Sequence, residues 1–151
     1  MKKLLIVYHS KTGNTRKMAD AVYLGAQRET DVETTFLHAF DAGPEHLLAC
    51  DGLLIGTPEN FGYMSGAIKD FFDRTYYEVL DDALNLPYAV FVSADNDGTG
   101  AVREIDRILK GYPMRKVCEP LISRKSVSEE DIQKSEELGE TLATGIAMGV
   151  F

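Results

Sequence analysis

The sequence predicts an α/β protein built on a doubly wound parallel sheet of five strands in the order 2-1-3-4-5, with helices on both faces. Short apolar runs rich in Val, Ile and Leu recur along the chain, as they do in strands buried on both faces of a parallel sheet. Segments with a helical spacing of apolar residues lie between these runs. Strands that alternate with helices are joined by right-handed crossovers, which produce an open, doubly wound sheet.

The expected strands differ in how apolar they are. Three runs are almost continuously apolar and suit the centre of the sheet: "KLLIVY" at 3–8, "DGLLIG" at 51–56 and "PYAVFVS" at 87–93. The run "VETTFLH" at 32–38 alternates between apolar and polar residues, which favours a place nearer an edge. The run "MRKVCEPLIS" at 114–123 contains Pro120 and is expected to form an edge or bulged strand.

The helices expected between the strands each carry an apolar stripe at helical spacing. They cover residues 15–28, 66–78 and 100–110. A last helix is expected to begin near Ser128, which can cap its N-terminus. Asp131, three residues later, can complete a capping box with Ser128. The segment at 43–50 has room for only a short helix.

Length, charge and hydropathy limit the functions that need considering. The chain has 151 residues, the size of one ordinary domain, and we expect a single domain over residues 1–151. A net charge of -8 argues against binding to a nucleic acid backbone. The apolar runs are too short to span a membrane, and "MKKLLIVYHS" lacks the features of a signal peptide. A cytoplasmic location is therefore expected.

Cysteine and histidine residues give no sign of a metal or redox-disulfide site. Cys50 and Cys118 lie far apart in the sequence, and we expect two inert, partly buried thiols. His9, His38 and His46 are likewise scattered, which favours surface or hydrogen-bonded histidines over ligands. No metal site is expected.

The topology directs attention to three loops. In open parallel sheets, ligands bind beyond the carboxyl ends of the strands, at the point where the winding reverses. The loops there are "HSKTGNT" after the first strand, "TPENFGYMSG" after the third and "SADNDGTG" after the fourth. These segments are the candidate binding site.

The first loop has the composition of a phosphate site. The first turn of a helix leaves N–H groups unpaired, with a partial positive charge behind them. Gly13 allows a close approach to the backbone, and Ser10, Thr12 and Thr15 add hydroxyl donors. Helix capping alone would explain one hydroxyl, but not three beside a glycine. The loop matches neither GxxxxGK[ST] nor GxGxxG, so we expect a phosphate held differently from those in P-loop and dinucleotide-binding proteins.

Two of the loops resemble those of a known family. "SKTGNT" is similar to the [ST]xTGxT phosphate loop of flavodoxins, and "GTPENFGYMSGAIKDFFDR" resembles the flavin-ring loop of flavodoxin-like NAD(P)H:quinone oxidoreductases and NADPH-dependent FMN reductases. The resemblance follows the order of elements along the whole chain. It implies a flavodoxin-like fold and non-covalently bound FMN. It also implies that the phosphate lies at Ser10, Lys11, Thr12, Gly13, Asn14 and Thr15.

The second loop has residue types that suit a flavin ring, which needs flat surfaces on its faces and donors near its nitrogen and oxygen atoms. Pro58 stiffens the start of the loop, and Asn60 has both a donor and an acceptor. Phe61 and Tyr63 are candidate stacking surfaces, and Gly62 permits a backbone change toward flavin N5. The alternative is that the two aromatic residues simply pack against the edge of the sheet.

The third loop is expected to contribute Ser93, Ala94, Asp95, Gly98 and Gly100 to the cofactor site. The resemblance implies that its N–H groups face the pyrimidine edge of the ring. Electron-carrying flavodoxins typically place a tyrosine from this loop against the flavin, whereas residues 93–100 contain no aromatic residue. One face of the ring is therefore expected to be open to a nicotinamide, a quinone or another flat substrate.

Acidic side chains near the ring have two interpretations. Glu59, Asp95 and Asp97 would disfavour a negatively charged reduced flavin if they lay close to it. They are equally well explained as solvated loop carboxylates. No protein side chain is expected to act as a catalyst, because the flavin carries the chemistry.

The expected function is that of an FMN-binding oxidoreductase, which takes reducing equivalents from NAD(P)H or a reductase and passes them to a quinone, a flavin or a redox protein. One alternative is an electron carrier between larger proteins, which the acidic charge supports. Another is a cofactor-free domain, although the first strand ends at His9 and Ser10 rather than in the acidic cluster of receiver domains. Quinone-reductase relatives are commonly homo-oligomers, and a homo-oligomer is one alternative for this chain.

Overall fold

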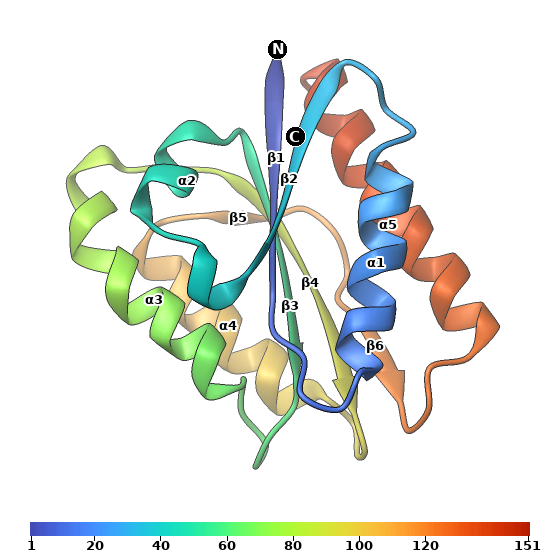
Figure 1. Ribbon diagram of the computed structural model, residues 1–151. Helices are drawn as coiled ribbons and strands as arrows, with labels where there is room; N and C mark the ends of the chain where they lie inside the picture. Colours follow the sequence, from blue (N-terminus) through green and yellow to red (C-terminus); the bar gives the residue numbers. More distant parts are fainter.

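A parallel sheet forms the centre of the protein in the computed structural model, which describes residues 1–151 (Figure 1). Its strands are paired in the order β2-β1-β3-β4, and every pairing is parallel. The strands span Val32–His38 (β2), Lys2–Tyr8 (β1), Gly52–Pro58 (β3) and Pro87–Ala94 (β4). The almost fully buried β3 and β4 are the continuous apolar runs, whereas β2 is only half-buried at the edge. The predicted fold class and strand order are confirmed.

The fifth strand position differs from the expectation. The predicted strand at 114–123 is divided into β5 (Arg115–Lys116) and β6 (Leu121–Arg124), which both pair with β4 in parallel. Pro120 lies between them and has no N–H to donate to a ladder. The chain therefore leaves β4 after β5 and returns to it further along as β6. The order 2-1-3-4-5 holds, with two short strands in the last place.

Helices cover both faces of the sheet, as expected (Figure 1). One face carries α1 (Asn14–Ala26) and α5 (Glu129–Met148), and the other carries α2 (Pro44–Ala49), α3 (Gly66–Val79) and α4 (Thr99–Gly111). Short 3-10 turns follow β2 at Ala39–Asp41 and α3 at Leu80–Asp82. Ser128 and Asp131 form the predicted capping box at the start of α5. None of these helices is both long enough and apolar enough to cross a membrane.

Alternation along the strands creates two cores. In β1, Leu5 and Val7 join the core beneath α2, α3 and α4, whereas Leu4 and Ile6 join the core beneath α1 and α5. Phe71 and Phe72 are buried in the first of these cores, as their helical stripe predicts. Phe71 and Phe72 therefore belong to the core and do not contribute to the binding loops.

The two helices of one face approach each other at glycines. A Cβ atom on Gly25 of α1 would overlap the carbonyl oxygen of Glu136, and one on Gly139 of α5 would overlap that of Val22. Reciprocal contacts of this kind require the absence of a side chain in both helices. They hold the backbone of α1 directly against that of α5.

Replacing Gly139 with Ala is expected to lower the free energy of unfolding by about 1 to 3 kcal/mol, because the added methyl group forces the two helices apart. Urea unfolding followed by circular dichroism measures the change. Gly66→Ala is the control, because a Cβ atom at Gly66 meets no atom within 4 Å and Ala is the better helix former. Equal stability of G139A and the parent protein would contradict the close contact.

Candidate functional site

The loops after β1, β3 and β4 meet at the edge of the sheet formed by the carboxyl ends of these strands, at the bottom of Figure 1. They enclose a cavity of about 130 Å³. Its lining comes from all three loops: Thr12 and Asn14; Pro58, Glu59 and Asn60; Ser93, Ala94 and Asp95. The structure therefore brings together segments that are far apart in the sequence.

The first loop presents a row of free backbone donors. Gly13 precedes α1 with a φ of 107°, a left-handed conformation that favours glycine. None of the N–H groups of residues 10–15 donates to an acceptor within the protein, because the first bonds of the turn start at Arg16 and Lys17. A Cβ atom at Gly13 would meet no atom within 4 Å, so this backbone faces open space. The arrangement fits an anion such as a phosphate.

The three hydroxyls of this loop have different partners. Ser10 Oγ accepts a hydrogen bond of 3.1 Å from the N–H of Arg16 and so caps the start of α1. Thr15 is buried, and its Oγ1 lies 2.7 Å from the Oγ of Ser93 on β4. Thr12 is exposed and its hydroxyl has no partner, as is typical of a side chain available to a ligand. The sequence does not distinguish the three hydroxyls. In the structure, those of Ser10 and Thr15 form hydrogen bonds within the protein.

The second loop is a two-residue β-hairpin. Asn60 and Tyr63 exchange backbone hydrogen bonds of 2.9 and 3.0 Å, and Phe61 and Gly62 at the tip have φ values of 56° and 68°. Positive φ at both central residues is the geometry of a type I′ turn. Phe61 is fully exposed at the tip, so it does not pack against the sheet edge. Tyr63 is half-buried and packs against the core. For Tyr63 this agrees with the alternative of packing against the sheet.

Two glycines and a carboxylate fix this hairpin against α4. A Cβ atom on Gly100 would overlap the carbonyl oxygen of Gly62, so the close approach requires a glycine. Glu59 Oε2 accepts a hydrogen bond of 3.1 Å from the N–H of Ala101, which places a negative charge at the N-terminus of α4. The N–H of Glu59 donates to the carbonyl of Ser93 over 2.8 Å. The second and third loops are therefore joined directly.

The third loop combines free donors with exposed acidic residues. The N–H groups of residues 95–98 have no acceptor within the protein, and Gly98 has a φ of 74°. Asp97 accepts hydrogen bonds from the N–H and the hydroxyl of Thr99, which hold the pKa of Asp97 below its usual value. Asp97 and Glu59 therefore stabilise the start of α4, while the exposed Asp95 lines the cavity. No aromatic side chain from this loop covers the cavity.

A histidine pair beside the first loop went unrecognised in the sequence. The rings of His9 and His38 lie 5.3 Å apart, and Phe40 packs on His38 at the same distance. The parallel register Tyr8↔His38 places His38 at the same edge of the sheet as the first loop, a pairing that the sequence alone does not give. Nδ1 of His9 is buried without a hydrogen-bond partner. Burial, followed by the charges of His38 and Lys11, lowers the pKa of His9.

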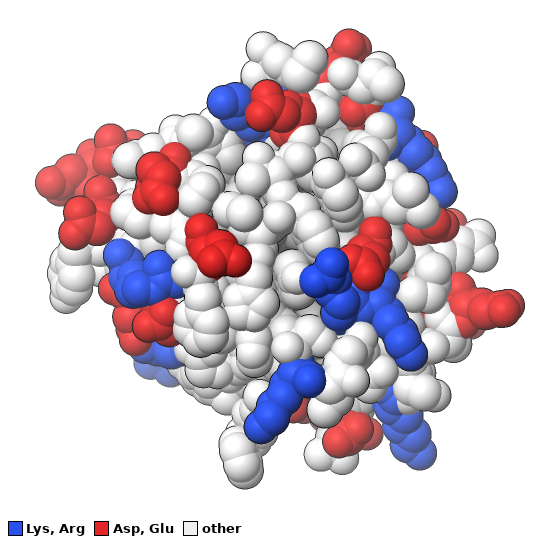
Figure 2. Space-filling view, in the orientation of Figure 1, with Lys and Arg blue, Asp and Glu red and all other residues white.

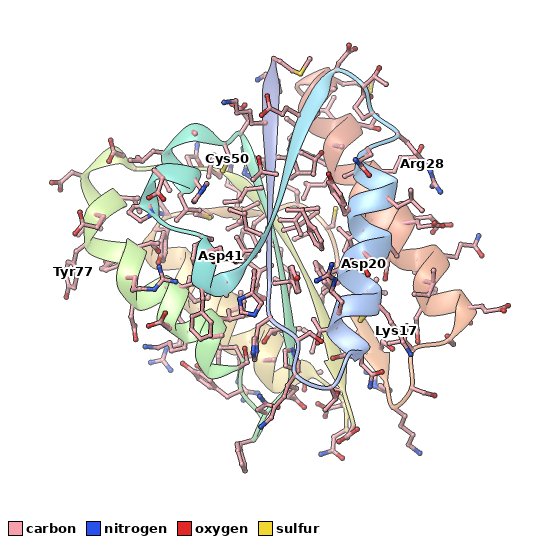
Figure 3. All side chains as sticks on the ribbon, in the orientation of Figure 1. Lys17, Asp20, Arg28, Asp41, Cys50 and Tyr77 are labelled. Atoms are coloured by element: carbon pink, nitrogen blue, oxygen red, sulfur yellow. The ribbon has the colours of Figure 1, made fainter.

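The cysteines lie away from this site. Figure 3 shows Cys50 at the opposite end of the sheet from the three loops. Burial raises the pKa of Cys50 to about 12 and also raises the pKa of the half-buried Cys118, so both favour the unreactive thiol form. No group of three or more His, Cys, Asp or Glu side chains is arranged to hold a metal ion. The free N–H groups gathered at the loops suit an anionic ligand.

His9 gives a pH prediction. Because the folded state lowers its pKa, the unfolded chain takes up a proton at His9 first as the pH falls through about 6.5. We expect the His9 contribution to stability to be complete above this pH and to be lost below it. Side-chain NMR measures the His9 titration, and thermal unfolding of the parent protein and His9→Gln measures the stability. A His9 midpoint at or above 6.5 would contradict the prediction.

Comparisons with known proteins agree with this geometry. A flavodoxin of Aquifex aeolicus is 42% identical over 73 residues, which are 48% of this chain and 40% of the relative. An NAD(P)H dehydrogenase (quinone) of Acidithiobacillus ferrooxidans is 30% identical over 95 residues, which are 50% of this chain and 48% of the relative. The matched segments thus span less than half of these curated relatives.

Similarity to a solved structure extends over nearly the whole chain. The crystal structure of flavodoxin 1 from Bacillus cereus has a TM-score of 0.78 and 26% identity, and the match covers 95% of this chain and 98% of that chain. The family model described as "Flavodoxin" matches residues 6–140. By this match the chain belongs to the flavodoxin family, whose members are FMN-binding redox proteins.

Proposed function

We propose that this protein is an FMN-dependent oxidoreductase that takes reducing equivalents from NAD(P)H or a reductase and passes them to a quinone, a flavin or a redox protein. The observation that carries the proposal is the open side of the binding site. Residues 93–100 supply no aromatic cover, and the only aromatic side chain at the tip of the second loop, Phe61, is fully exposed. A flat substrate can therefore stack on a ring bound between these loops.

The FMN phosphate is assigned to residues 10–15 in this proposal. Six adjacent N–H groups without internal acceptors support it, together with the free hydroxyl of Thr12 and the exposed ammonium of Lys11. Backbone donors and a helix N-terminus bind a dianion with little formal charge from the protein. An acidic chain of net charge -8 can therefore still bind a phosphate at this loop.

The flavin ring is assigned to the space between the second and third loops. Asn60 and the free N–H of Gly62 can donate to one edge of the ring, and the N–H groups of residues 95–98 can donate to the pyrimidine edge. Pro58 lines this space, and the exposed ring of Phe61 offers a flat aromatic surface beside it. FMN supplies the electron- or hydride-accepting ring, while these residues bind it, orient it and stabilise charge at its edge.

The name of one relative supports a nicotinamide donor. The A. ferrooxidans protein is named as an NAD(P)H dehydrogenase acting on quinone, and it matches half of this chain. The proposal carries this donor and acceptor chemistry over to the present chain. The cytoplasm, where such donors occur, is the proposed location.

An electron carrier between larger proteins is the second candidate. The net charge of -8 favours it, because an acidic protein is steered toward basic faces of its partners. Figure 2 shows acidic side chains gathered over the end of α3, where Glu78, Asp81 and Asp82 are exposed. Such a carrier exchanges single electrons at the ring edge and needs no open stacking face.

Replacing Thr12 with Ala is expected to raise the Kd for FMN about tenfold, the effect of losing one hydrogen bond to a charged group. The free energy of unfolding of the FMN-free protein should not change, because the Thr12 hydroxyl has no internal partner. Quenching of FMN fluorescence measures the affinity. Thr30→Ala, an exposed threonine just before β2, is the control. If T12A and T30A bind FMN with equal affinity, Thr12 does not contact the phosphate.

Anaerobic mixing of the FMN-loaded protein with NADPH or NADH tests the reaction. We expect loss of the oxidised-flavin absorbance in a single phase, at a rate well above that of free FMN under the same conditions. If the absorbance persists with both dinucleotides, direct reduction is excluded. In that case, reduction by a one-electron donor in two separate steps would favour the carrier.

A further inference from the structure

A second groove lies beside the candidate FMN site, between α4 and the segment that joins β5 to β6. Its volume is about 440 Å³, more than three times that of the cavity among the three loops, and it falls in the range of small-molecule sites. Thr99 stands at the end nearest the third loop, and Lys110 lines the other end. No residue of this groove belongs to the first or second loop.

The rim of this groove is basic although the protein is acidic. Arg103, Arg107 and Lys110 recur on one face of α4 at spacings of four and three residues, and all three are exposed. Arg107 and Lys110 form no ion pair, and Arg103 has only a 3.5 Å contact with its neighbour Glu104. Cations gathered along one line, two of them without an ion pair, favour a ligand with several negative charges.

The acidic residue in the groove does not cancel these charges. Asp106 accepts a hydrogen bond of 2.7 Å from the hydroxyl of Tyr88 and a 2.9 Å ion pair from Lys116. Its carboxylate is therefore already balanced by groups outside the basic row. Arg107 and Lys110 therefore keep their charges free, whereas Arg103 lies near Glu104 and Asp97.

The floor of the groove is apolar. Val102, Pro120 and Ile122 contribute it, and Pro120 and Ile122 are only half-buried. A proline ring beside branched aliphatic side chains is an apolar surface against which the face of a heteroaromatic base can pack. Phosphates alone would not need such a floor, so the ligand combines a planar group with negative charge.

The direction of the groove connects it to the candidate FMN site. A helix rises by about 1.5 Å per residue, so Thr99 and Lys110 are about 16 Å apart along α4. At the Thr99 end, the adjacent Gly100 contacts the carbonyl of Gly62 at the tip of the second loop. An extended ligand in the groove therefore has one end at the ring loops and the other at Lys110.

From these features we propose that the groove binds the adenosine-phosphate half of a nicotinamide dinucleotide, an inference that rests on the proposed function. The phosphates pair with Arg103, Arg107 and Lys110, and the adenine lies on Pro120 and Ile122. The nicotinamide end extends past Thr99 toward the open face between the loops. The basic rim then favours a phosphorylated dinucleotide as electron donor. Its nicotinamide ring reaches the open face of the candidate FMN site.

NMR titration of the FMN-loaded protein with adenosine 2′,5′-bisphosphate tests the site without any turnover. We expect chemical-shift changes at the amides of residues 99–110 and 121–122. The variant Arg107→Gln/Lys110→Gln should bind this probe at least about tenfold more weakly, because each substitution removes a charge-assisted hydrogen bond. Changes confined to other elements, or equal binding by the variant, would overturn the site.

The variant Arg28→Gln/Lys134→Gln is the matched control, because it makes the same change in formal charge away from the groove, in the turn after α1 and on α5. Arg28 and Lys134 are both exposed and form ion pairs with exposed or partly buried carboxylates, and such surface pairs add little to stability. We expect the control to bind the probe as the parent does, and both variants to keep the parent affinity for FMN. Inorganic phosphate is the second probe, and competition by it at equal concentration would overturn the assignment to a nucleotide.

The experiment separates this site from the proposed function. Reduction by NADPH with the same KM in the parent and in the R107Q/K110Q variant would overturn the groove while leaving the reductase function in place. Binding of adenosine 2′,5′-bisphosphate along α4 without reduction of FMN by NADPH would retain an adenosine-phosphate site and exclude direct reduction by the dinucleotide. A raised KM with an unchanged Kd for FMN would support both.

Discussion

Unpaired backbone N–H groups at one edge of the parallel sheet are the constraint on which the binding site depends. Parallel strands all end at the same edge, so the loops that follow β1, β3 and β4 are brought together by the topology itself. Residues 10–15 and 95–98 leave their donors without internal acceptors there. Such groups are costly to bury without a partner, and their exposure at this edge makes them available to an anionic ligand.

The three loops are also fixed to one another. The buried pair of Thr15 and Ser93 joins the first loop to β4, and Glu59 joins the second loop to both β4 and α4. The contact of Gly62 with Gly100 completes the connection. A site held in this way is organised before its ligand arrives, so less conformational entropy is lost on binding.

Much of the fold was predictable because its signals are local. The apolar runs of β1, β3 and β4, the alternation in β2 and the capping pair of Ser128 and Asp131 all identify their elements without tertiary information. The division of the fifth strand was not predictable in detail. Pro120 indicates an interruption, but only the course of the chain along β4 decides that both pieces pair with the same neighbour.

The site was predictable as a set of loops but not as a set of contacts. The pairing of Thr15 with Ser93 joins residues 78 positions apart, and the edge-to-face contact of His9 with His38 depends on strand register. The cap that Glu59 provides for α4 likewise requires knowing which helix begins beside the second loop. Local composition identifies donors and rings, whereas their partners come from the topology.

The glycine contacts between α1 and α5 have a consequence for ligand binding at the far end of α1. With its backbone seated on that of α5, α1 cannot slide along its own axis, so its first turn stays at one height above the sheet. A helix near the carboxyl end of the chain thereby sets the position of a loop near the amino end. A change that separates the two helices therefore affects the anion site as well as the fold, whereas a change confined to the loop need not affect the fold.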